Sequence, residues 1–94
     1  MNEVPGIDSK AAAEMAALIE RFARRYAADG FTHPRIAAAV VTARGWAGLD
    51  RPTFADNLGI TVDEVEQAES GGVGADALPE QLADRLRQLG ISLS

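Results

Sequence analysis

The sequence contains no cysteine, which excludes a disulfide framework and any thiolate that could bind a metal or act as a nucleophile. It has a single histidine, His33, and therefore no second histidine or cysteine to complete a catalytic pair or a metal site. Ser9, Ser70, Ser92 and Ser94 do not lie in any recognisable nucleophile motif. We therefore expect that the protein is not an enzyme and uses no cofactor and no metal.

Long hydrophobic runs are also missing, because no apolar stretch approaches the ~20 residues that a membrane span requires. The N-terminus lacks the pattern of basic and then apolar residues that marks a signal peptide, so we expect a cytoplasmic protein. Aromatic residues make up only 5% of the chain, and alanines are many, so helices should pack closely on small side chains. A length of 94 residues predicts one domain, 1–94.

The net charge of −5 is spread unevenly along the chain. Residues 1–30 carry five acids and four bases, and residues 31–51 carry one acid and three bases. Residues 52–94 carry eight acids and two bases, which gives this part a charge of −6. A strongly acidic half disfavours nucleic acid as its partner and favours a basic one.

The stretch Leu49–Gly71 predicts two short helices joined by a tight turn. Asp50 is a good N-cap for the first of them, and Gly59 suits the left-handed position just after its end. Thr61 and Glu64 then form the sequence pattern of a capping box, which starts the second helix. A helix, a three-residue turn and a helix make the plan of a helix-turn-helix.

Apolar stripes predict the remaining helices. Met15, Ile19, Phe22 and Tyr26, with Leu18 beside them, line one side of a helix over 9–30. This stripe either covers the domain's own core or forms a homodimer contact, since a long apolar face needs a partner. In all we expect helices near 9–29, 34–46, 51–58, 62–70 and 79–89, no sheet, and a loose N-terminus over 1–8.

Two features of the connections carry more specific expectations. Trp46, at the end of the second helix, should cover the end of the core, and a role in stacking on a ligand is the alternative. The glycine-rich segment 70–76 is not a phosphate-binding loop, because no strand precedes it and no Lys-Ser or Lys-Thr follows. We expect a flexible connector there.

From residue 36 to residue 93 the order of motifs resembles a known family. Phe54-Ala55, Leu58-Gly59-Ile60-Thr61, Glu69-Ser70-Gly71 and Leu89-Gly90-Ile91 resemble the DNA-binding domain of phage Cro and repressor proteins, the XRE-like family. The resemblance implies an all-α, five-helix bundle of the phage-repressor-like helix-turn-helix type, with a core over 34–93 and an extra N-terminal helix. The excess of arginine over lysine, with many alanines, is typical of GC-rich bacterial genomes.

The resemblance also implies DNA binding through residues 62–70, laid in the major groove as the recognition helix. Its outward positions are Val62, Asp63, Glu64, Glu66 and Gln67. Of these, Gln67 is suited to pairing with adenine. The resemblance gives Arg51 a contact with bases or phosphate, gives Arg44 a contact with the DNA backbone, and gives Glu69 a structural role.

Two functions of different classes follow. The first is a dimeric transcriptional regulator that binds DNA through Arg51 and Gln67. The second is a protein-interaction module, in which the acidic helix-turn-helix binds a basic protein, because Asp63, Glu64 and Glu66 would each face phosphates across the groove. A continuous basic face formed by Arg35, Arg44 and Arg51 would favour DNA.

Overall fold

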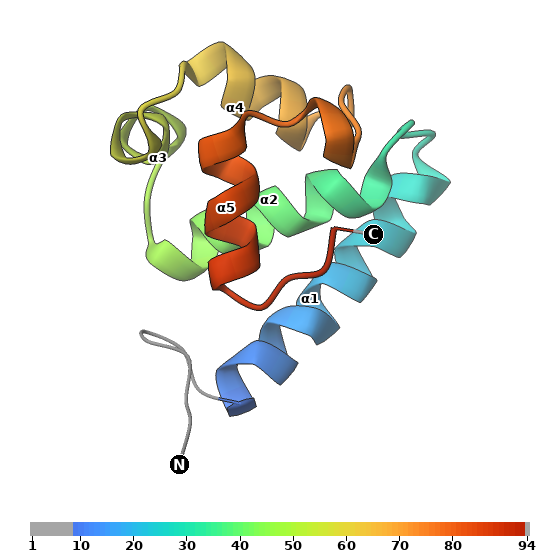
Figure 1. Ribbon diagram of the computed structural model, residues 1–94. Helices are drawn as coiled ribbons and strands as arrows, with labels where there is room; N and C mark the ends of the chain where they lie inside the picture. Colours follow the sequence, from blue (N-terminus) through green and yellow to red (C-terminus); the bar gives the residue numbers. More distant parts are fainter. Residues whose placement is uncertain (1–8, 94) are drawn as a thin grey trace.

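The computed structural model describes residues 9–93, which fold into five α-helices and one short 3-10 helix (Figure 1). Their bounds are α1 Ser9–Ala28, α2 Pro34–Ala47, α3 Arg51–Leu58, α4 Val62–Glu69, η1 Ala75–Ala77 and α5 Glu80–Gln88. No strand occurs within these residues. The prediction of an all-α fold with five helices is confirmed, and each predicted end lies within one residue of the observed one. The loose N-terminus expected over 1–8 lies outside the described residues.

Helix α2 forms the centre of the molecule, with α1 along one side and α3, α4 and α5 on the other (Figure 1). Ile36, Ala37, Ala38, Ala39 and Val40 are all buried. Five consecutive buried residues cover more than one side of a helix, so α2 is surrounded rather than packed on a single face. Its alanines let the neighbouring helices approach closely, as the composition predicts.

The core is filled by a few large side chains that reach α2 from the other helices. Phe54 of α3, Val65 of α4, and Leu82 and Leu86 of α5 are each at most 1% exposed. Val65 and Ala68 form the inward face of α4, and both are fully buried.

The apolar stripe of α1 packs against α2 of the same chain. Met15 and Ile19 are buried, and Phe22 and Tyr26 are half-buried. Tyr26 also stacks on Phe31, with ring centroids 4.7 Å apart. The stripe is therefore covered within the chain, as the first of its two interpretations predicts, and the homodimer stays a prediction.

Two expectations for the connections differ from the structure. Trp46 does not cover the core, because 43% of its surface is exposed. The glycine-rich segment is more than a connector, since the carbonyl of Gly71 accepts a hydrogen bond from the His33 N–H at 3.1 Å. Gly71 also lies against the ring of Phe31, so the segment after α4 is joined to the α1–α2 linker.

Within residues 9–93, no helix has the length and apolar character that crossing a membrane requires.

Candidate functional site

Short-range capping contacts fix the start of α3 and of α4. The Asp50 carboxylate accepts a hydrogen bond from the Thr53 N–H at 2.9 Å, and so caps α3. Gly59 follows α3 with φ of 71°, a left-handed conformation that glycine adopts at little cost. The Thr61 hydroxyl then accepts from the Glu64 N–H at 3.1 Å, and the Glu64 carboxylate accepts from the Thr61 N–H at 2.9 Å. These contacts set the angle between α3 and α4 through a three-residue turn.

Helix α4 has one buried side and one exposed side. Val65, Ala68 and Glu69 are buried. The five positions predicted to point outward, Val62, Asp63, Glu64, Glu66 and Gln67, are all exposed. Three of these five are acidic and none is basic, so the exposed side of α4 is negatively charged.

Glu69 is the buried acid of α4, and its side chain is only 2% exposed. Its carboxylate accepts hydrogen bonds from Arg44 Nε at 2.6 Å and from Arg44 Nη2 at 3.2 Å. It also accepts one from Arg51 Nε at 3.0 Å. We call these three residues the Glu69 cluster. A buried carboxylate requires such partners, because an unpaired charge away from water is very costly.

The two arginines of the Glu69 cluster differ in how many of their guanidinium nitrogens donate hydrogen bonds within the chain. All three guanidinium nitrogens of Arg44 donate within the chain, since Nη1 binds the Leu49 carbonyl at 3.0 Å. The hydrogen bonds of Arg44 to Glu69 raise its pKa above the ordinary value. Arg51 donates through Nε alone among the described residues, and its side chain is 49% exposed. Arg51 therefore keeps two terminal amino groups for an outside ligand.

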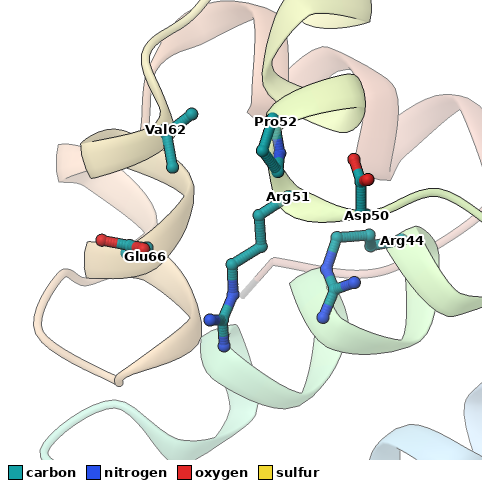
Figure 2. A pocket seen from close by; sticks show the side chains of 6 residues that line it. All are labelled: Arg44, Asp50, Arg51, Pro52, Val62 and Glu66. Carbon is teal, nitrogen blue, oxygen red and sulfur yellow. The ribbon is translucent and has the colours of Figure 1, made fainter.

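A shallow depression of about 500 Å³ lies beside this cluster, between α3 and α4. Its lining residues are Arg44, Asp50, Arg51, Pro52, Val62 and Glu66. Figure 2 shows Arg51 extending from the start of α3 with its guanidinium beside that of Arg44, and Glu66 on the neighbouring turns of α4. The sequence prediction named four of these six residues. The sequence analysis did not name Asp50 and Pro52 as lining residues. Their positions directly before and after Arg51 in the sequence could have indicated them.

The three arginines of the continuous basic face that would favour DNA all form ion pairs within the chain. Arg35 pairs with Glu20 of α1, and this contact lowers the pKa of Glu20. Arg44 and Arg51 both pair with Glu69. Each of the three arginines thus has a carboxylate partner within the chain.

Gln67, the predicted reader of adenine, is exposed on α4 but lies against the following loop. Its Oε1 is 2.9 Å from the position that a Cβ would occupy at Gly72. The carboxamide therefore lies beside Gly72, at the loop that follows α4.

No group of three or more His, Asp or Glu side chains within residues 9–93 is placed to hold a metal ion. Comparison with protein-family models, with curated proteins and with solved structures finds no match to this chain.

Proposed function

We propose that this chain is a helix-turn-helix transcriptional regulator that contacts duplex DNA through the exposed side of α4. The observation that supports the proposal most is the arrangement of α3 and α4. Their caps and the three-residue turn hold α4 with Val65 and Ala68 against α2 and its opposite side open along its length. A B-DNA major groove, about 12 Å wide, admits a helix presented in this way.

In this function Arg51 supplies the phosphate contact. Its Nε is held by Glu69, and its terminal amino groups have no hydrogen-bond partner among the described residues, so a phosphate oxygen can accept from them. Gln67 is the base reader, because a carboxamide can pair with N6 and N7 of adenine.

The charge of the same surface favours a second candidate function, a protein-interaction module that binds a basic protein. The exposed side of α4 carries Asp63, Glu64 and Glu66 and no base. Two like charges 4 Å apart repel by about 1 kcal/mol in water, and by several in a drier interface. Specific DNA binding exceeds nonspecific binding by only about 4–10 kcal/mol, so three acids facing phosphates would offset much of it.

Fluorescence anisotropy against duplexes selected from a random pool, at about 0.15 M salt, tests the two candidates. A regulator should bind a selected duplex tightly, lose affinity on Arg51→Ala, and lose selectivity on Gln67→Ala. Arg21→Ala is the matched control, because Arg21 is an exposed arginine on α1, away from the proposed contact.

The triple variant Asp63→Asn, Glu64→Gln, Glu66→Gln separates the candidates further. It keeps the capping box, since glutamine can replace glutamate there. If the acids only obstruct DNA, the variant should bind arbitrary duplex more tightly and with a steeper salt dependence. A wild type that binds no duplex, together with a triple variant that loses a basic protein ligand, would reject the regulator and support the interaction module.

A further inference from the structure

A second hollow lies on the other side of α4, between its first turns and the segment that leads into α5. Its volume is about 180 Å³, and its lining residues are Asp63, Glu64, Gln67, Val73, Ala77 and Pro79. Val73, Ala77 and Pro79 give it an apolar floor. Val73 is also packed against the hydrophobic core, which fixes this floor in place.

The polar rim of this hollow is acidic. Asp63 and Glu64, at the start of α4, are its charged lining residues, and both are exposed. No lysine or arginine lines the hollow to offset these charges. An apolar floor inside a rim of one charge is complementary to a ligand with an apolar group between two cationic ones.

We propose that this hollow binds a cationic segment of a partner protein, which places one apolar side chain on Val73, Ala77 and Pro79 and its lysines or arginines beside Asp63 and Glu64. The proposal rests on the second candidate function, the interaction module, and adds the place and the chemistry of the contact. Phosphate-bearing ligands do not fit, because the rim repels them.

A second copy of this chain is a poorer occupant. Arg21, Arg24 and Arg25 on α1 are its exposed basic cluster, and they would meet an unlike surface on the next copy. Such a head-to-tail contact either closes into a ring or extends into a filament, and nothing in the described residues favours closure. Self-association is therefore an outcome that the test distinguishes.

The probes are synthetic peptides with two arginines on each side of one central residue, which is leucine, methionine, phenylalanine or glycine. Binding is followed by amide NMR shifts of the full chain at low and at physiological salt. The best apolar peptide should bind about tenfold more tightly than the glycine peptide, because the hollow buries part of its apolar side chain. The shifts should centre on Gln67, Val73 and Ala77.

Two variants with matched controls locate the contact. Asp63→Asn should weaken binding about threefold, the usual effect of one partly exposed charge pair, whereas Asp56→Asn on α3 should not. Ala77→Lys should abolish binding by filling the hollow and placing a cation beside the arginines of the peptide. Ala27→Lys, at an exposed alanine of α1, should leave binding intact.

Each outcome supports or overturns the proposal. Apolar preference, with shifts at the hollow and loss on Ala77→Lys, supports it. Equal binding of the apolar and glycine peptides overturns it, although an acidic surface that binds basic proteins would remain. No binding of any peptide at millimolar concentration overturns both this proposal and the interaction module. Concentration-dependent shifts without peptide that centre on Gln67, Val73 and Ala77 would assign the hollow to a second copy and overturn the partner proposed here.

Discussion

The carboxylate of Glu69 holds the guanidinium of Arg44 through two hydrogen bonds, Nε to Oε2 at 2.6 Å and Nη2 to Oε1 at 3.2 Å. Glu69 ends α4, and Arg44 lies in the last turn of α2. A two-point contact between an arginine and a carboxylate fixes orientation as well as distance. It therefore fixes the end of α4 against α2. The hydrogen bond from Arg51 to the same carboxylate also joins the start of α3 to the end of α4.

We expect Glu69→Gln to destabilise the fold by about 2–3 kcal/mol. Breaking a buried ion pair usually costs about 3–5 kcal/mol, and the cost is smaller here because both arginines reach solvent. Urea denaturation followed by circular dichroism measures this loss. Glu66→Gln is the matched control, since Glu66 is exposed on the same helix and should change stability by less than about 0.5 kcal/mol. Equal stabilities of the two variants would mean that the cluster does not hold the helices together.

The Glu69 cluster shows which part of the site could be predicted from sequence. The structural role of Glu69 was predicted, because its place in the motif order indicated it. Its partners were not, since Arg44 and Arg51 lie 25 and 18 residues away in the chain. Sequence reasoning assigned both arginines to DNA, and only the packing of α2, α3 and α4 brings them to one carboxylate.

We expect the Asp50 cap to make stability depend on pH at the acid end. The Thr53 hydroxyl, and after it the Thr53 N–H, lower the pKa of the Asp50 carboxyl below its ordinary value of 3.8. A group whose pKa is lower in the folded state stabilises that state above its unfolded pKa and loses this effect as pH falls through the folded pKa. The stability advantage of wild type over Asp50→Asn should thus be constant near neutral pH and shrink below about pH 4.

Carboxyl NMR titration provides the direct measurement of this prediction. Thr53→Val removes the hydroxyl and keeps the N–H, so it should move the pKa of Asp50 back toward the ordinary value. An Asp50 pKa at or above 3.8 in the wild type would contradict the prediction.

We expect Gly71→Ala to be more damaging than a substitution at any other left-handed glycine within residues 9–93. Gly71 has φ of 77°, and a Cβ there would lie 2.8 Å from Cδ2 of Phe31. The backbone conformation costs about 1–2 kcal/mol, and the forced contact adds about 1–3 kcal/mol. Gly90→Ala is the matched control, because Gly90 has the same φ and nothing within 4 Å of its Cβ position. Thermal denaturation giving equal losses would show that Phe31 moves aside freely.

The starts of α3 and α4 could be predicted because their caps are local: the groups that Asp50, Thr61 and Glu64 contact lie three residues away. Trp46 was placed wrongly because the sequence does not show which side of a helix end meets the core. Phe54, from the next helix, fills the core instead and is 1% exposed. The role of Gly71 depends on Phe31, forty positions earlier, and no local pattern encodes that contact.

We expect a homodimer at micromolar concentration, as the apolar content of the chain predicts. Because α2 already covers the stripe of α1, the contact must use other surfaces, and Trp46 is the most exposed large hydrophobic residue described. Sedimentation velocity measures the mass, and the emission of this single tryptophan should shift to the red on dilution as the dimer separates. A monomer at every concentration would contradict the prediction.

We expect Thr42→Val to leave the fold as stable as before, or more stable by up to about 1 kcal/mol. Thr42 lies on α2, is 4% exposed, and its Oγ1 has no hydrogen-bond partner within the described residues. A buried hydroxyl without a partner costs about 1–3 kcal/mol of desolvation, and valine replaces it with a methyl group of similar shape. Val40→Thr is the reverse exchange on the same helix, at a fully buried position, and should lose about 1–3 kcal/mol. Urea denaturation of both variants measures the difference, and a Thr42→Val protein less stable than wild type by over 1 kcal/mol would show that the hydroxyl is satisfied in solution.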